Sequence, residues 1–166
     1  MEYKKQKTCM FTGHRDVMRI EPEHMSRLAP EMIKLIDLGV DTFLCGGAIG
    51  WDTYTAMTVI AMKASRPELK LVLVLPCCKA DQIRFWGRTH IEFYDEIIKC
   101  ADDIIYVSER YYDGCYQDRN VKMIEMSSYC ICYLKRMRSG TGQTVCMAEK
   151  DGLSIINLAD GGFEHV

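Results

Sequence analysis

The sequence lacks the features that mark membrane proteins, secreted proteins and small metal-stabilised domains. No apolar run approaches the roughly 18 residues that a membrane span needs, and the first nine residues hold no apolar signal-peptide stretch. No Cys-x-x-Cys occurs, which excludes a zinc ribbon and a thioredoxin motif. We therefore expect no membrane association, no metal site and a cytoplasmic location.

An excess of charge of either sign is also absent. The 21 Lys and Arg residues nearly balance the 23 Asp and Glu residues, for a formal net charge of −2. Basic clusters are confined to residues 4–7 and 135–138, whereas a protein that binds nucleic acid concentrates positive charge on one face. The composition therefore argues against a nucleic-acid partner.

Cysteine, by contrast, is abundant, with nine residues. The number is odd, and most of the nine lie in apolar runs, where a free thiol behaves as a small hydrophobic side chain. Neither Cys77 nor Cys78 is flanked by groups that activate a thiolate. We expect nine reduced thiols and no cysteine nucleophile.

Length and composition predict a single domain over residues 1–166. A chain of 19.1 kDa with 48% apolar residues buries roughly 70% of its unfolded surface. It contains no internal repeat, linker or low-complexity segment. The expected strands are 8–12, 42–45, 69–75, 103–107, 129–134 and 153–157, and the expected helices are 22–38, 51–64, 81–101, 119–128 and 142–150.

Strict alternation of helices with apolar strands predicts an α/β fold of the Rossmann-like, doubly wound type. We expect a mostly parallel sheet of about six strands with helices on both faces. Ligands of such sheets bind beyond the carboxyl ends of the strands, so the loops that follow the strands are the ones to search. In the strand order 3-2-1-4-5-6, the loops after the first and fourth strands would meet at the switch point.

Two glycine-containing turns follow predicted strands and open helices. Gly46, Gly47 and Gly50 would let backbone N–H groups approach an anion at a helix amino terminus. A tight turn that binds nothing explains them equally well. The Ser-Gly-Thr-Gly segment 139–142 repeats the arrangement, with ordinary helix capping as its alternative. Asp52 would cap its helix or contact a ribose hydroxyl.

Arginine and tyrosine side chains follow the first and fourth predicted strands. Arg15 follows the first and Arg119 opens the helix after the fourth, so both would reach the switch point. There Arg119 would pair with a phosphate, or else form a surface ion pair with Asp118. The tyrosine-rich loop 111–116 would stack a base, or else pack as a lid that touches no ligand.

The third predicted helix carries one apolar and aromatic stripe. Its members are Trp86, His90, Phe93 and Ile97, and helical spacing favours a core or dimer contact over a cofactor face. Asp81, at the predicted start of this helix, is expected to be its N-cap. We expect the protein to be a homo-oligomer.

Four motifs occur in order along the chain: Met-Phe-Thr-Gly-His-Arg at 10–15, Gly-Gly-Ala-x-Gly-Trp-Asp at 46–52, Arg119-Asn120, and Ser-Gly-Thr-Gly at 139–142. Together they resemble the YpsA-like family of the SLOG superfamily, which also holds the DNA-processing protein DprA and the LOG phosphoribohydrolases. The resemblance implies a Rossmann-like fold and a pocket for a nucleotide or a nucleotide-derived ligand. It implies no particular reaction and no certain cofactor.

The LOG enzymes provide a test of activity. They carry Arg-Lys at a helix start and then a Pro-Gly-Gly-x-Gly-Thr-x-x-Glu loop, which Arg119-Asn120 and Gly140-Thr141 match in part. The Glu position falls on Thr144, and the Pro-Gly-Gly is absent. The resemblance therefore implies phosphate binding without the carboxylate that LOG-type hydrolysis needs.

The leading hypothesis is a protein, such as a sensor or regulator, that binds a ligand of the NAD, ADP-ribose or nucleoside phosphate class. Its alternatives are a hydrolase that cleaves an N-glycosidic or phosphate bond of such a ligand, with Asp52 or His14 as the acid/base, and a DprA-like binder of single-stranded DNA. The expected ligand-binding residues are Gly13, His14, Arg15, Gly46, Gly47, Gly50, Asp52, Arg119, Asn120, Ser139, Gly140, Thr141 and Gly142.

Overall fold

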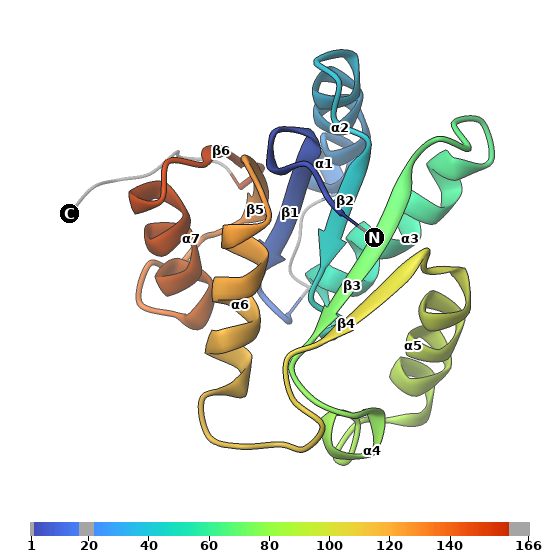
Figure 1. The fold of residues 1–166 in the computed structure, drawn as a ribbon, viewed down its shortest axis with the longest axis vertical. Helices are drawn as coiled ribbons and strands as arrows, with labels where there is room; N and C mark the ends of the chain where they lie inside the picture. The colour runs from blue at the N-terminus through green and yellow to red at the C-terminus, as the bar shows by residue number, and fades with distance from the viewer. Residues whose placement is uncertain (1, 17–21, 160–166) are drawn as a thin grey trace.

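A computed structural model describes residues 2–16 and 22–159 (Figure 1). Strands and helices alternate along nearly the whole of it. In chain order the elements are η1 (Lys5–Lys7), β1 (Thr8–Gly13), α1 (Pro22–Ser26), α2 (Leu28–Asp37), β2 (Thr42–Cys45), α3 (Trp51–Lys63), β3 (Lys70–Leu75), α4 (Lys79–Gln82), α5 (Arg88–Cys100), β4 (Asp103–Tyr106), α6 (Cys115–Glu125), β5 (Tyr129–Tyr133), α7 (Gly140–Lys150) and β6 (Ser154–Asn157). None of the helices in this described part is long and apolar enough to cross a membrane.

The strands form one six-stranded, all-parallel sheet in the order β4-β3-β2-β1-β5-β6. The predicted α/β, Rossmann-like fold is confirmed. The predicted strand order is wrong, because β4 extends the sheet beyond β3 instead of pairing with β1. The neighbour of β1 is β5, so the switch point lies between these two strands.

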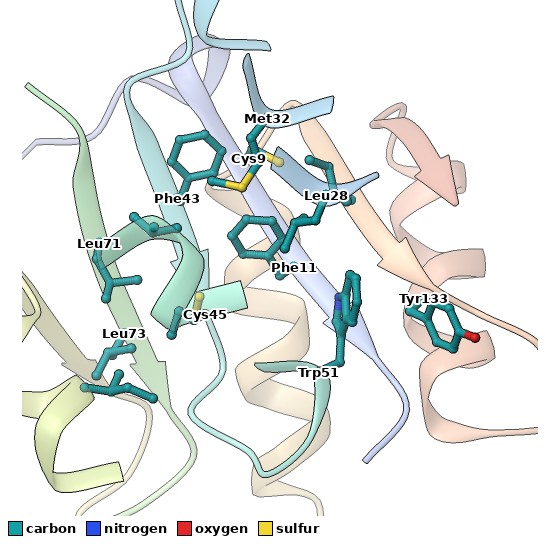
Figure 2. Close-up of a cluster of buried hydrophobic side chains, with 14 of the residues drawn as sticks. Cys9, Phe11, Leu28, Met32, Phe43, Cys45, Trp51, Leu71, Leu73 and Tyr133 are labelled. Carbon is teal, nitrogen blue, oxygen red and sulfur yellow. The ribbon is translucent and has the colours of Figure 1, made fainter. Parts of the chain in front are cut away.

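Helices cover both faces of the sheet, and successive side chains of each strand point to opposite faces. Cys9 and Phe11 join a cluster with the helices α2, α3 and α5, whereas Met10 joins a cluster with α6 and α7. Figure 2 shows the first cluster, in which the rings of Phe11 and Phe43 stack with centroids 5.6 Å apart. The central strand β1 is therefore packed on both faces, and this packing holds its carboxyl end in place.

The predicted helix 22–38 is two helices, α1 and α2. The break falls at Arg27, whose N–H donates to the carbonyl of His24 at 3.3 Å. Pro30 has no N–H to donate to the carbonyl of Ser26, four residues before it, so the α-helical hydrogen-bond ladder is interrupted there.

The predicted helix 81–101 is also split, into α4 and α5. Gly87 precedes α5 in an extended conformation, and Trp86 lies before the helix begins. The predicted stripe is therefore wrong in part: Tyr94 and Ile97 are buried, whereas Phe93 is 43% exposed. His90, the remaining member of the stripe, is exposed as well.

Asp81 lies inside α4 and is not an N-cap, which corrects that prediction. Its Oδ2 accepts hydrogen bonds from Arg110 Nε and Tyr111 N, both at 2.9 Å. These bonds tie α4 to the loop after β4.

Helices α6 and α7 both begin earlier than predicted. Gly114, in a left-handed conformation with φ of 101°, precedes α6, so Arg119 lies one turn inside the helix. Asp118 accepts a hydrogen bond from the hydroxyl of Tyr112, and the predicted alternative of an Arg119–Asp118 surface ion pair is wrong, because Arg119 is buried. Ser139 precedes α7 as its N-cap.

Candidate functional site

A cavity of about 290 Å³ lies at the carboxyl end of β1, walled by the loops after β1, β2 and β5 and by α6 and α7. We call it the phosphate cavity, after the ligand group that the sequence predicts there. The predicted site residues that line it are Gly13, His14, Arg15, Gly46, Asp52, Arg119, Asn120, Ser139, Gly140 and Thr141. The lining residues outside the predicted set are Phe11, Thr12, Ala48, Tyr116, Met123 and Thr144.

Helix α6 brings Arg119 to this cavity. The chain leaves β4 at one edge of the sheet and returns through α6, which packs on one face of the sheet beside α7 and leads to β5 (Figure 1). Residues of α6 from Tyr116 to Met123 thereby reach the cavity. Arg119 is only 6% exposed, and its Nη1 donates a hydrogen bond to the carbonyl oxygen of Gly46. Arg15, in the loop after β1, lies with its Cζ 5.5 Å from the centroid of the Tyr116 ring, so the segments after the first and fourth strands approach each other although their strands do not pair.

Asp52 and Arg119 place opposite charges beside Gly46. A Cβ on residue 46 would lie 2.6 Å from Arg119 Cζ and 2.8 Å from Asp52 Oδ2, so only glycine fits there. Asp52 Oδ2 accepts a hydrogen bond from Ala48 N at 3.1 Å. Burial raises the pKa of Asp52 and lowers the pKa of Arg119, and the charge of each opposes the shift of the other. The two buried charges therefore stabilise each other at the cavity wall.

A hydrogen-bond chain joins α6 to α7 along the same wall. Arg119 Nε donates to Asn120 Oδ1 at 2.7 Å, and Asn120 Nδ2 donates to Thr144 Oγ1 at 2.8 Å. Thr144 Oγ1 donates in turn to the carbonyl of Gly140 at 3.0 Å. Thr144, at the position where LOG enzymes carry Glu, thus holds the orientation of Asn120.

His14 joins the loops after β1 and β5. Its Nε2 accepts hydrogen bonds from the backbone N–H groups of Lys135 and Arg136, at 3.0 and 3.3 Å. Its own carbonyl accepts from Trp51 N at 3.2 Å. Burial, helped by the charge of Arg136, lowers the pKa of His14, so the ring is the neutral acceptor that this bonding requires. The geometry argues against the predicted role of His14 as an acid, because Nε2 is already engaged.

Three predicted site glycines do not line the cavity. Gly47 and Gly50 have positive φ values of 68° and 86°, and a side chain on residue 50 would meet the backbone of Arg15. A Cβ on Gly142 would lie 2.9 Å from Met137 Cα. The close packing at these glycines suits the alternatives of a tight turn at Gly47 and Gly50 and of helix capping at Gly142, whose N–H donates to Ser139 Oγ, and their place in the site stays a prediction.

Two arginines and the amino terminus of α7 line the cavity beside the carboxylate of Asp52. Arg15 Cζ and Arg119 Cζ lie 5.5 and 5.7 Å from the centroid of the Tyr116 ring. Gly140 and Thr141 form the first turn of α7, where backbone N–H groups have no partner within the helix. Among residues 2–16 and 22–159, no three His, Cys, Asp or Glu side chains gather in a way that could hold a metal ion.

Comparison with known proteins gives relatives across most of the chain. Residues 3–151 match the model of a family described as the YspA SLOG family. A UPF0398 protein of Halalkalibacterium halodurans is 27% identical over 118 residues, which cover 70% of this chain and 59% of the relative. A UPF0398 protein of Staphylococcus saprophyticus is 30% identical over 119 residues, which cover 67% of this chain and 62% of the relative. The chain thus spans about three fifths of the length of these curated relatives.

Two solved structures share the fold. DprA from Streptococcus pneumoniae aligns with a TM-score of 0.64 and 17% identity, over 95% of this chain and 52% of that protein. DprA from Helicobacter pylori, which is described as binding single-stranded DNA, aligns with a TM-score of 0.63 and 18% identity, over 91% of this chain and 64% of that protein. At these identities the likeness extends to the fold alone.

Proposed function

The chain belongs to the YspA SLOG family, and we propose that it binds a nucleotide-derived ligand whose phosphate enters the phosphate cavity. One observation carries the proposal: the buried guanidinium of Arg119 and the amino terminus of α7 line the same cavity. A guanidinium offers paired N–H donors to a phosphate, and a helix amino terminus adds backbone N–H donors and a favourable dipole.

The remaining lining residues receive roles from their chemistry. Arg15 is exposed at the mouth and adds positive charge. Asp52 repels a phosphate, so it accepts from a ribose hydroxyl, and Asn120 and Ser139 supply further polar contacts. The ligand is thus a ribose phosphate unit, and the whole domain, residues 1–166, serves to hold it.

Hydrolysis of the ligand is the first alternative. Asp52 is the only carboxylate among the described residues that line the cavity, and burial raises its pKa toward that of a general acid. The charge of Arg119 opposes this shift, and Thr144 replaces the LOG glutamate. We therefore favour binding without hydrolysis.

Binding of single-stranded DNA is the second candidate, and it is supported by the fold shared with DprA of Helicobacter pylori. This likeness weighs against our expectation that nucleic acid is not a partner. The net charge of −2 argues against DNA binding, because a protein that binds a strand neutralises many phosphates with basic side chains. Fluorescence anisotropy of a labelled oligothymidylate decides between them: tight binding that weakens steeply with salt would replace the small-ligand proposal.

Calorimetry with AMP, ADP-ribose and adenosine tests the proposal. We expect AMP and ADP-ribose to bind and adenosine, which lacks phosphate, to bind far more weakly. Arg15→Gln should weaken both phosphate ligands by roughly tenfold, as expected for a charged hydrogen bond. Arg88→Gln is the matched control, because Arg88 is exposed at the start of α5 and pairs with Glu92. Equal binding of AMP and adenosine would contradict the proposal.

A further inference from the structure

A second and larger cavity adjoins the phosphate cavity. It has a volume of about 650 Å³ and lies between the segment that joins α4 to α5 and the loop that follows β4. Arg15 and Tyr116 line both cavities, so the two lie next to each other. We call this second cavity the aromatic groove, after Phe85, Tyr111 and Tyr116.

The aromatic groove exposes large rings beside positive charge. Phe85 is 88% exposed and Tyr111 is 56% exposed, although burying such rings is favourable. Arg84 Cζ lies 5.2 Å from the centroid of the Phe85 ring. Arg110 also lines the groove. Exposed rings flanked by guanidinium groups are suited to stack a flat, electron-rich base next to a phosphate.

The wall of the groove is held in place before any ligand binds. Asp81 accepts hydrogen bonds from Arg110 Nε and Tyr111 N, and so fixes the loop after β4 against α4. Gln82 Nε2 donates to the carbonyl of Gly47 at 2.9 Å, which ties α4 to the turn behind the phosphate cavity. Such preorganisation lowers the ordering cost of binding.

We propose that the aromatic groove is a second subsite, which stacks the nucleobase of a second nucleoside carried by the same ligand. The proposal rests on the proposed function, because the shared residues Arg15 and Tyr116 place the groove beside the bound phosphate. The ligand class is then two nucleosides joined through their phosphates, with the joining phosphates beside Arg15. A mononucleotide would fill the phosphate cavity and leave the groove empty.

Charge favours this occupant over a nucleic-acid strand. The groove has three arginines, one of which is paired with Asp81, and the chain as a whole has a net charge of −2. A strand needs a basic track that follows several phosphates. A ligand with two joined phosphates needs only the charge at the junction of the two cavities.

Calorimetry with NAD⁺ and AMP tests the second subsite with the full chain. Phe85→Ala removes an exposed ring, so the fold is retained, and Phe93→Ala is the matched control on an exposed phenyl of α5 outside both cavities. We expect Phe85→Ala to weaken NAD⁺ binding on the order of tenfold, as for loss of one stacked base. AMP affinity should change by less than about twofold, and Phe93→Ala should alter neither.

Each contrary outcome separates the two proposals. Unchanged NAD⁺ affinity in Phe85→Ala, with NAD⁺ and AMP still weakened by Arg15→Gln, would overturn the second subsite and leave the proposed function standing. An equal loss of NAD⁺ and AMP binding would show that the groove holds the base of a mononucleotide, which also overturns it. A native protein that binds neither ligand would overturn both proposals. Phe85-dependent binding of oligothymidylate without NAD⁺ binding would assign the groove to a strand.

Discussion

The guanidinium of Arg119 lies over Gly46, at the place where a side chain on residue 46 would begin. Arg119 Nη1 donates a hydrogen bond to the carbonyl of Gly46. The missing side chain of Gly46 also leaves the space that the guanidinium occupies. The two residues come from the helix α6 and from the turn after β2, and both line the phosphate cavity. The absence of a side chain at Gly46 therefore determines where the guanidinium of Arg119 lies in the cavity wall.

Gly46→Ala tests this relationship. The added methyl group would displace Arg119, and we expect the free energy of unfolding to fall by about 1–3 kcal/mol, as in other overpacked sites. Binding of ADP-ribose in calorimetry should be lost. Gly87→Ala is the control, because an added Cβ there meets no atom within 4 Å. Wild-type ligand affinity in Gly46→Ala would show that Arg119 is not needed for binding.

The hydrogen bonds of His14 predict a dependence of stability on pH. Burial lowers the pKa of His14 in the folded protein, so between that pKa and the ordinary value of 6.5 the unfolded chain binds more protons. This contribution to stability is complete above about pH 6.5 and is lost as the pH falls through the folded pKa, by at most about 1.4 kcal/mol per pH unit. Urea unfolding at pH 7.5, 6 and 5 measures it. His14→Gln should show a shallower dependence, and an unchanged slope would exclude His14 as the source.

Thr144 predicts that AMP is not hydrolysed. The native protein should release no ribose 5-phosphate from AMP above background, because a general acid–base group contributes about 10²–10⁴-fold in rate and none stands at position 144. Thr144→Glu should also release no ribose 5-phosphate, since a glutamate at this buried site would break the hydrogen bonds of Thr144 with Asn120 and Gly140. Turnover of the native protein at about 1 s⁻¹ or faster would identify it as an enzyme and point to Asp52.

The cysteines predict a two-step thiol titration. All nine are free, and six are buried, whereas Cys100 is exposed. Burial raises the pKa of Cys45 well above the ordinary value, which keeps it a thiol and unreactive. In the native protein we expect one fast-reacting thiol, absent in Cys100→Ser, and close to nine after denaturation. A denatured count of seven or fewer would indicate a disulfide or another modification.

The sequence predicts all six strands to within about one residue at each end, because the strand residues are apolar and turns or charged residues bound them. It does not predict the breaks at Arg27 and Gly87. The periodicity of apolar residues continues across both breaks, while the missing N–H of Pro30 and the extended backbone of Gly87 act locally. Helical periodicity alone thus overestimates helix length here.

Most of the predicted site residues line one cavity. Loops after parallel strands share one edge whatever the strand order, so Arg15, Arg119 and Ser139 meet although the predicted order is wrong. The sequence does not separate Gly47, Gly50 and Gly142, which do not line the cavity, from Gly46 and Gly140, which do, because a ligand-binding glycine and a packing glycine have the same sequence signature. Phe85, on which the proposed second subsite depends, is not among the predicted site residues, because its exposure follows from the break before α5, which the sequence does not reveal. The homo-oligomer stays a prediction.

The pairing of β1 with β5 determines the order in which the molecule is completed during synthesis. Cys9 pairs in register with Tyr129, and three other strands are made between them. A nascent chain that ends before Tyr129 therefore has an open β1 edge, with unpaired backbone groups that invite aggregation. Helix α7 and the loop held by His14 emerge later still. The phosphate cavity is therefore incomplete until the first turns of α7 have been made, and a product truncated before Tyr129 displays an open β1 edge without the α7 wall of the cavity.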